Sequence, residues 1–263
     1  MKKLVLLSAL CLLLVGAQGT IEIRKNGRVV ASNREEPANA VRVLFIGNSL
    51  TFWNEMPWMT RRIAGSLGAQ PPLVTEFNGM GGATLRQHWD RGNALRAIRE
   101  RRWDFVVLQP QSTEMIDQPE ETVKYARFFD REIDRAGAKT VIFGTWVPAG
   151  RPISQAALTE RYASLARELS ARLAPIGTAW DALRRDGRDL FDPGGVHPNL
   201  KGSYLAACVF YSIFYGKSPQ GATHTFETKF DVPESDRADL ENDRLDAATA
   251  EVIQLAAWEV VQK

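Results

Sequence analysis

Apolar runs of strand length alternate with segments of helical periodicity along most of the chain. The runs cover Val41 to Ile46, Leu73 to Phe77, Phe105 to Leu108 and Val141 to Phe143, with a weaker one near Pro175 to Ile176. Apolar runs without polar alternation are typical of strands buried on both faces, and strand-helix-strand order implies parallel pairing. The pattern therefore predicts an α/β fold of three layers, with helices on both faces of a central parallel sheet.

The segments between these runs show the spacing of amphipathic helices. Helices are expected from about Glu120 to Arg135, over Pro198 to Tyr215 and over about Ala247 to Val261. Gly216 is a stop signal for the helix that precedes it, and residues 217–246 are polar and irregular by pattern. A further predicted helix carries the clearest apolar stripe, which consists of Leu158, Tyr162, Leu165, Leu169 and Leu173.

The first 19 residues carry the pattern of an export signal. Lys2 and Lys3 supply a positive start, Leu4 to Val15 is apolar apart from Ser8, and Ala17-Gln18-Gly19 is a small-x-small cleavage site. This apolar run is shorter than the roughly 20 residues that span a bilayer. We therefore expect cleavage, no stable membrane insertion afterwards, and a secreted or periplasmic protein; an uncleaved anchor is the alternative.

The expected organisation is a signal peptide over 1–19, a hairpin and linker over 20–39, and one domain over 40–263. Asn26-Gly27 lies between two short β-type runs, which is the usual signal for a two-residue hairpin turn. The polar stretch from Ser32 to Asn39 then reads as a linker.

Charge and cysteine content narrow the possible functions. The chain has 33 Lys and Arg against 31 Asp and Glu, and removal of residues 1–19 leaves 31 of each. Nucleic-acid binding draws on an excess of basic residues, so we expect no nucleic-acid partner. Cys11 leaves with the signal, which leaves Cys208 without a disulfide partner. Cys208 shares a helical face with Tyr204 and Tyr211, which favours a buried structural cysteine over a catalytic thiol.

Residues with catalytic potential follow the predicted strands. In a parallel sheet, ligands bind at the carboxyl ends of the strands. The segments that follow the four strands are Gly47-Asn48-Ser49-Leu50-Thr51, Gly79-Met80-Gly81-Gly82-Ala83-Thr84, Gln109-Pro110-Gln111-Ser112 and Thr145-Trp146-Val147. A fifth segment, Gly194-Gly195-Val196-His197, precedes the helix expected from Pro198. They bring a hydroxyl, backbone amides, a side-chain amide and an imidazole to one place.

This set of groups suits acyl transfer. A serine hydroxyl is a weak nucleophile until a base takes its proton, and topology places His197 to act on Ser49. The N–H groups of Ser49 and Gly82, with an amide side chain, can stabilise the oxyanion. Each of these positions also has a non-catalytic interpretation. Ser49 could be a helix N-cap, His197 could simply precede the helix from Pro198, and Gly79 to Thr84 could be a phosphate-binding loop. Gln109 competes with Gln111 for the amide role.

These blocks resemble those of the SGNH/GDSL hydrolases over about Val41 to Tyr215. Gly47-Asn48-Ser49-Leu50 is similar to the first block and Gly82 to the second; Gln111 stands where the third has asparagine, and His197 matches the last. The resemblance implies a flavodoxin-like α/β/α sandwich with esterase or deacetylase activity. It also implies Ser49 and His197 as catalytic residues, an oxyanion hole of Ser49, Gly82 and Gln111, and no metal or organic cofactor.

Two positions depart from the family pattern. Asn48 stands where the family has aspartate before the serine, and Gly194 stands where it has an acid three residues before the histidine. Asp192 lies five residues before His197 and reaches it if the loop folds back. The alternative is a Ser49–His197 dyad whose imidazole is oriented by a backbone carbonyl or water.

The substrate is inferred from the family resemblance. It implies short-chain esters, either small molecules or carbohydrate O-acetyl groups. Trp53, Trp146 and His88 are expected near the catalytic edge as walls of a substrate pocket, with core packing as the alternative for the two tryptophans. Two other functions remain open: an acyltransferase of the same fold, and a catalytically weak exported carbohydrate-binding protein.

Overall fold

The computed structural model describes residues 12–15, 21–25, 28–32, 36–226 and 245–262. The chain divides into two compact units. One consists of Met1–Ala38 with Phe226–Asn242, and the other of Asn39–Thr225 with Asp243–Lys263.

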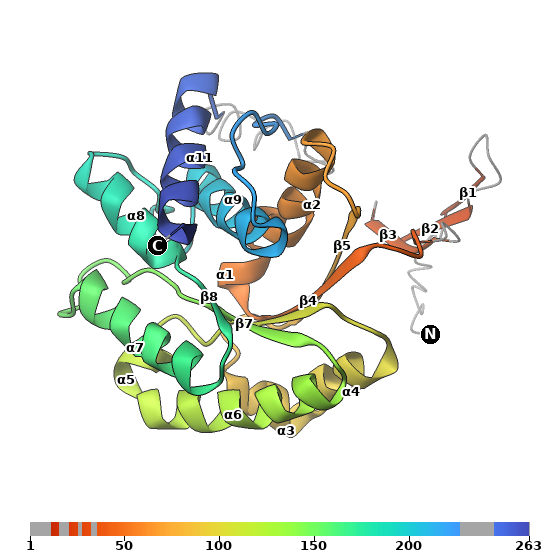
Figure 1. The fold of residues 1–263 in the computed structure, drawn as a ribbon, viewed down its shortest axis with the longest axis horizontal. Helices are drawn as coiled ribbons and strands as arrows, with labels where there is room; N and C mark the ends of the chain where they lie inside the picture. Colours follow the sequence, from red (N-terminus) through yellow and green to blue (C-terminus); the bar gives the residue numbers. More distant parts are fainter. Residues whose placement is uncertain (1–11, 16–20, 26–27, 33–35, 227–244, 263) are drawn as a thin grey trace, which may run out of the picture. The chain divides into compact units, whose positions relative to one another are not determined.

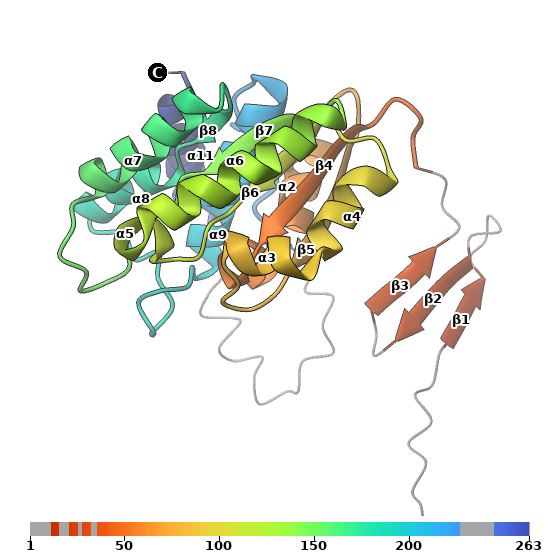
Figure 2. The same ribbon diagram turned by 90° about the horizontal axis from the view of Figure 1, so that it is seen from below.

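The smaller unit contains a three-stranded antiparallel sheet. Its strands are β1 (Leu12–Val15), β2 (Ile21–Lys25) and β3 (Arg28–Ser32), in the order β1-β2-β3 (Figure 2). Lys25 pairs with Arg28, so the Asn26-Gly27 of the predicted turn stands between the strands, outside the described residues. Of the predicted export signal, only β1 lies among the described residues.

The larger unit is built on a five-stranded sheet in which every pairing is parallel, with the order β5-β4-β6-β7-β8. This confirms the predicted central parallel sheet. The strands are β4 (Val41–Gly47), β5 (Leu73–Gly79), β6 (Phe105–Leu108), β7 (Lys139–Phe143) and β8 (Arg172–Ala174).

Helices cover both faces of this sheet, which completes the three predicted layers (Figure 1). On one face lie α1 (Ser49–Phe52), the 3-10 helix η1 (Trp53–Glu55), α2 (Met56–Ser66), α8 (Ile176–Arg185), α9 (Leu200–Tyr215) and α11 (Ala247–Val261). On the other lie α3 (Leu85–Arg91), α4 (Asn93–Glu100), α5 (Glu114–Asp117), α6 (Pro119–Arg135) and α7 (Gln155–Glu168).

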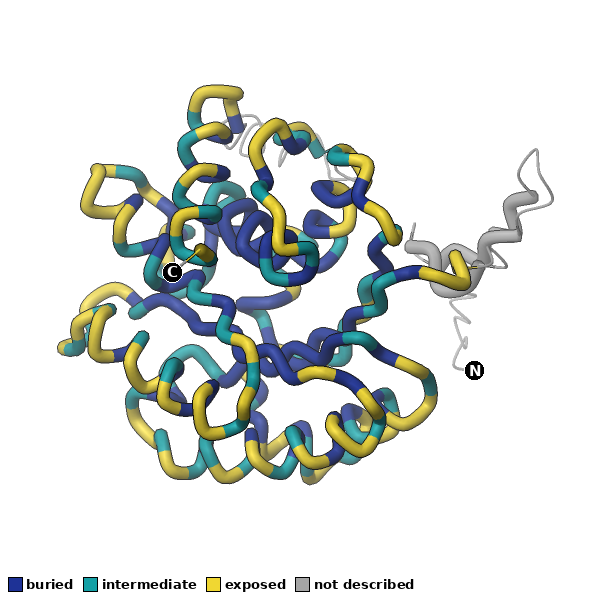
Figure 3. The backbone as a smooth tube through the Cα atoms, in the orientation of Figure 1, coloured by how far each residue is buried: buried dark blue, intermediate teal, exposed yellow. Residues whose placement is uncertain are grey.

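Most residues of β4, β6 and β7 are buried, as the unbroken apolar runs predict (Figure 3). In the edge strand β5, burial is confined to Leu73 and Val74. Phe45 and Phe143 point to the side of α9, where each meets the ring of Phe210 at 5.1 Å between centroids. Their neighbours Leu44 and Ile142 point to the opposite core beneath α3, α4, α6 and α7. Alternation along each strand thus feeds two hydrophobic cores from one sheet.

Three predicted boundaries are wrong. The weak strand lies at Arg172–Ala174, and Ile176 already begins α8. Helix α7 ends at Glu168, so Leu173 of the predicted stripe belongs to β8. The chain turns at Ser170, whose φ is +52°, and the stripe continues by coincidence beyond that turn. Helix α9 likewise begins at Leu200 rather than Pro198, because the side chain of Asn199 caps it by accepting from Gly202 N–H at 3.1 Å.

The predicted C-terminal helix is present and belongs to the core. Helix α11 packs on α8 and α9, with Ile253 fully buried. The Gln254 amide donates to the Tyr204 hydroxyl at 2.7 Å and to the Ala222 carbonyl at 3.1 Å. None of the helices among the described residues combines the length and apolar character that crossing a bilayer requires.

A buried histidine braces the end of β4. His88 of α3 is 5% exposed, and its Nε2 lies 2.9 Å from the carbonyl oxygen of Gly47. A carbonyl oxygen can only accept, so Nε2 carries a hydrogen and donates it. Burial lowers the pKa of His88, because desolvation disfavours the charged imidazolium.

The burial of α11 predicts a large difference between two substitutions in the same helix. Ile253→Ala empties a fully buried position and is expected to lower the free energy of unfolding by about 2–5 kcal/mol. Leu255→Ala changes a side chain that is 44% exposed and is expected to cost less than about 1 kcal/mol. Urea denaturation of both variants measures the difference; equal losses would show that α11 is not an integral part of the core.

The lowered pKa of His88 predicts acid sensitivity. As the pH falls, the unfolded chain takes up this proton before the folded one does. The stabilising contribution is therefore present above about pH 6.5 and lost below it. His88→Gln keeps a donor for the Gly47 carbonyl and removes the titration. Calorimetry between about pH 7.5 and about pH 5.5 should show a steeper fall in Tm for the parent than for the variant. Parallel curves would contradict the assignment.

Candidate active site

The strand order places the site at the carboxyl ends of β4 and β6. The chain leaves β4 toward β5 on one side and returns to β6 on the other, so the loops after β4 and β6 diverge. Ligands of open α/β sheets bind in the crevice at such a switch point. Ser49 follows β4, and Gln109 and Gln111 follow β6.

The structure brings Ser49 and His197 into hydrogen-bond contact. Ser49 Oγ lies 2.9 Å from His197 Nε2, although 148 positions separate the two residues. Ser49 is the first residue of α1, and its N-cap is Asn48, whose side chain accepts from Leu50 N–H at 3.2 Å. The cap role considered for Ser49 therefore belongs to Asn48, which leaves the Ser49 hydroxyl to face the imidazole.

Gln109 anchors the loop that carries Ser49 through side-chain hydrogen bonds. Its side chain is fully buried, and its Oε1 accepts from Asn48 N–H at 2.8 Å and from Thr51 Oγ1 at 3.0 Å. A Cβ at Gly47 would stand 2.6 Å from this oxygen, so only glycine leaves room for the amide there. Gln109 thus has a structural role, and the oxyanion role of Gln111 stays a prediction.

A folded-back loop carries His197. Asp192 N–H donates to the His197 carbonyl at 2.9 Å, and Gly195 N–H donates to the Asp192 carbonyl at 3.0 Å. Gly195 turns the chain with φ +70°. From outside the loop, Trp146 Nε1 donates to the Val196 carbonyl at 3.0 Å.

The fold-back brings Asp192 beside the imidazole despite its irregular spacing. Asp192 Oδ2 lies 3.6 Å from His197 Nδ1, and the two side chains are 22% and 29% exposed. This separation is longer than a hydrogen bond, so the contact is an electrostatic one. Asp192 Oδ1 is occupied by Gly194 N–H at 3.1 Å.

The Gly82 loop lies against the Ser49 loop. Asn48 Nδ2 donates to the Ala83 carbonyl at 2.9 Å, which joins the residues next to Ser49 and Gly82. Gly82 has φ +68° and open space within 4 Å of where a Cβ would stand. Across the described ranges, the N–H groups of Ser49 and Gly82 donate to no protein acceptor, so both can receive a ligand oxygen.

Gln111 is half-buried in a turn held by Glu114. Gln111 N–H donates to Glu114 Oε2 at 3.2 Å, and burial raises the pKa of that carboxyl. The Gln111 side chain donates from Nε2 to Ser112 Oγ at 3.0 Å and accepts from Thr113 N–H at 2.8 Å. The second Nε2 hydrogen remains for another acceptor.

The three predicted pocket residues have different surroundings. Trp53 is half-buried and its ring stacks on that of His197, with centroids 4.2 Å apart and planes 12° apart. Trp146 is 1% exposed and stacks on Trp180 at 3.9 Å, so the prediction that it walls an open pocket is wrong. Its ring packs in the core instead, and its indole N–H donates to the Val196 carbonyl of the His197 loop. His88 lies behind the Ser49 loop rather than facing a pocket.

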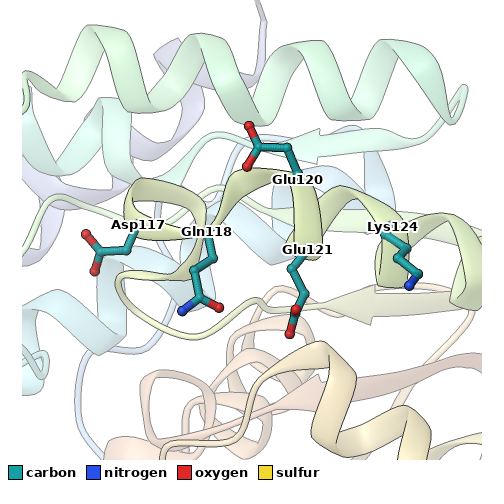
Figure 4. A pocket seen from close by; sticks show the side chains of 5 residues that line it. All are labelled: Asp117, Gln118, Glu120, Glu121 and Lys124. Atoms are coloured by element: carbon teal, nitrogen blue, oxygen red, sulfur yellow. The ribbon is translucent and has the colours of Figure 1, made fainter.

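A surface hollow elsewhere does not form a second site. It is lined by Asp117, Gln118, Glu120, Glu121 and Lys124 around the start of α6. Their side chains point to different sides of the helix rather than toward a common point (Figure 4). Among the residues that the structure describes, no cluster of three or more His, Cys, Asp or Glu is arranged to hold a metal ion.

Sequence reasoning missed two contributors to this site. The anchoring role of Gln109 has no motif, because it depends on the pairing of β4 with β6. Asn54 was not singled out at all, yet its Nδ2 donates to the Pro198 carbonyl at 3.2 Å and to Ser203 Oγ at 2.9 Å. The one available signal is an asparagine soon after the nucleophile block, which by itself indicates only a turn.

No family model matches the sequence, and the search of curated proteins found no match. Among solved structures, a DUF4886 family protein from Bacteroides uniformis has a TM-score of 0.64 at 16% identity, covering 85% of this chain and 95% of that one. An acetylxylan esterase from Geobacillus stearothermophilus has a TM-score of 0.56 at 13% identity, covering 69% and 97%. At these identities the likeness concerns the fold alone.

A third structure is related in sequence as well. This protein from Slackia heliotrinireducens, assigned to the SGNH hydrolases, is 33% identical, with a TM-score of 0.57. The alignment covers 66% of this chain and 98% of that one. The shared fold and this identity over nearly the whole of the relative lead to one conclusion: the chain belongs to the SGNH hydrolases.

Proposed function

We propose that this protein is a serine esterase that hydrolyses short-chain esters through an acyl-serine intermediate. The observation that carries the proposal is the 2.9 Å contact between Ser49 Oγ and His197 Nε2 at the carboxyl edge of the sheet. A hydroxyl within reach of an imidazole is the geometry of an activated nucleophile.

In the proposed acylation, Ser49 Oγ attacks the ester carbonyl carbon as its proton passes to His197 Nε2. The carbonyl π electrons move to oxygen, which forms a tetrahedral oxyanion. When this collapses, the bond to the alcohol oxygen breaks and His197 returns the proton to the leaving alcohol. Water then attacks the acyl-Ser49 carbonyl by the same route, again with His197 as base.

The proposed oxyanion hole consists of the N–H groups of Ser49 and Gly82 with the side-chain amide of Gln111. The two N–H groups come from adjacent loops joined by the Asn48–Ala83 hydrogen bond. Such donors stabilise charge that develops only in the transition state, and the loss of one typically costs about 3 kcal/mol. The positive φ of Gly82 turns its peptide without a side chain in the way.

We assign Asp192 the role of the triad acid, acting through a weakened contact. To accept the Ser49 proton, His197 must carry its own hydrogen on Nδ1, the nitrogen that faces Asp192 at 3.6 Å. The carboxylate stabilises the imidazolium by charge at this distance, with less directional control than a short hydrogen bond provides.

For the substrate we propose carbohydrate O-acetyl groups, with export by the N-terminal signal as the route to them. Acetylxylan esterases share this fold, and the family resemblance points to short acyl groups. Residues 1–19 carry the sequence pattern of an export signal. A balanced net charge is compatible with a neutral glycan substrate.

The proposed nucleophile predicts a selective loss of activity. Ser49→Ala should lower kcat for p-nitrophenyl acetate by at least about 10³-fold, because it removes the hydroxyl that contacts His197 Nε2. Ser66→Ala changes a serine at the end of α2 whose hydroxyl donates to the Ile63 carbonyl, and it should leave the rate unchanged. Circular dichroism checks that both variants fold. Equal rates for the parent and Ser49→Ala would overturn the proposal.

The 3.6 Å contact predicts a mild effect at Asp192. Asp192→Asn should lower kcat/KM by about tenfold, far less than the roughly 10⁴-fold loss when a hydrogen-bonded triad acid is changed in the same way. Asp189→Asn in the same loop, with a side chain that accepts from Phe191 N–H, is the matched control. Steady-state kinetics on both variants measures the difference. A loss near 10⁴-fold at Asp192 would mean that the acid holds His197 by a short hydrogen bond during turnover.

A further inference from the structure

The segment just after the nucleophile helix has an unusual backbone. Asn54 and Glu55 are consecutive non-glycine residues with φ +52° each, between α1 and the start of α2 at Met56. This left-handed region is unfavourable for residues with a side chain, and it persists where surrounding contacts determine it. The contacts of Trp53 and Asn54 supply such a constraint.

Asn54 ties the nucleophile segment to the histidine segment. Its Nδ2 donates to the carbonyl of Pro198, the residue after His197, at 3.2 Å, and to Ser203 Oγ at 2.9 Å. Ser203 is 1% exposed and its hydroxyl donates in turn to the Trp53 carbonyl at 3.4 Å. The amide therefore joins two parts of the chain more than 140 positions apart.

Trp53 adds a second contact to the same histidine. Its indole ring lies nearly parallel to the imidazole of His197, 4.2 Å away between centroids. Ser49 contacts the Nε2 edge of that imidazole, so residues 49–54 touch it at one edge and one face. In contrast, the contact of Asp192 at Nδ1 is 3.6 Å.

We propose that Trp53 and Asn54 form a clamp that positions His197 for proton transfer with Ser49. The proposal rests on the proposed catalytic function of Ser49 and His197. The clamp acts at the ring face and through the Pro198 carbonyl, and it supplements an acid that stands too far away to orient the imidazole by a hydrogen bond. Trp53 and Asn54 are positioning residues, and neither takes part in the proton transfers that His197 carries out.

The test compares two glycine substitutions at neighbouring positions with the same backbone angle. Asn54→Gly and Glu55→Gly both relieve a left-handed φ, and both add the same freedom to the unfolded chain. Only Asn54→Gly removes the hydrogen bonds to Pro198 and Ser203. We expect Asn54→Gly to lower kcat for p-nitrophenyl acetate by about 10- to 100-fold with little change in KM, because a small displacement of the base is costly. Glu55→Gly should stay within about twofold of the parent. Asn54→Gly should have a lower Tm than Glu55→Gly, because it loses two hydrogen bonds, and should keep the native circular dichroism spectrum at the assay temperature.

A second pair tests the stacked ring. Trp53→Phe keeps a flat ring against the imidazole and should retain most of kcat, whereas Trp53→Ala should lose about tenfold. The rate at which a fluorophosphonate labels Ser49 should fall in parallel with kcat, since labelling needs the same base but no natural substrate. A rise in KM at constant kcat in Trp53→Ala would show that Trp53 binds substrate, which overturns its part in the clamp.

The outcomes separate the clamp from the proposed function. If the parent labels at Ser49 and turns over esters, while Asn54→Gly matches Glu55→Gly in both assays, the clamp alone is wrong. If the parent neither labels nor turns over esters, the proposed function is wrong and the clamp falls with it. A fall of kcat in Asn54→Gly that is accompanied by loss of the native circular dichroism spectrum at the assay temperature would assign Asn54 to stability instead.

Discussion

The buried side-chain amide of Gln109 joins the ends of β4 and β6 at the carboxyl edge of the parallel sheet, next to Ser49. Its Oε1 accepts from the N–H of Asn48 and the hydroxyl of Thr51, in space that Gly47 leaves by having no side chain. Buried polar groups are costly unless paired, so this arrangement has few alternatives. The direction of α1, and with it the position of the Ser49 hydroxyl, depends on this amide.

The histidine side of the site is built differently. His197 lies on a loop that folds back on itself through the Asp192–His197 backbone bond and the turn at Gly195. Trp146 supports this loop from the core, and Trp53 and Asn54 meet it from the nucleophile side. Several moderate contacts thus set the orientation that a single carboxylate hydrogen bond commonly sets. This explains how an acid at irregular spacing is compatible with a well-placed Ser49–His197 pair.

Much of the fold could be predicted because its signals are local. Unbroken apolar runs marked the sheet strands, and the glycine after Tyr215 marked the end of α9, where Gly216 adopts φ +63°. The errors arose where local signals coincide. Leu173 continues the apolar spacing of α7 although the chain has already turned, and Pro198 suits a first helical position although Asn199 is the cap. Periodicity alone cannot register a turn that tertiary packing imposes.

By itself the sequence determined which groups reach the catalytic edge. Ser49, Gly82 and Gln111 follow predicted strands, and parallel strands all end on the same side. The family resemblance added His197 to this set. Only the tertiary structure decided how these groups meet. The separation of Asp192 from His197, the burial of Trp146 and the contacts of Asn54 depend on side chains far apart in sequence. Their arrangement follows from close packing and from the pairing of buried polar atoms, which no local pattern records.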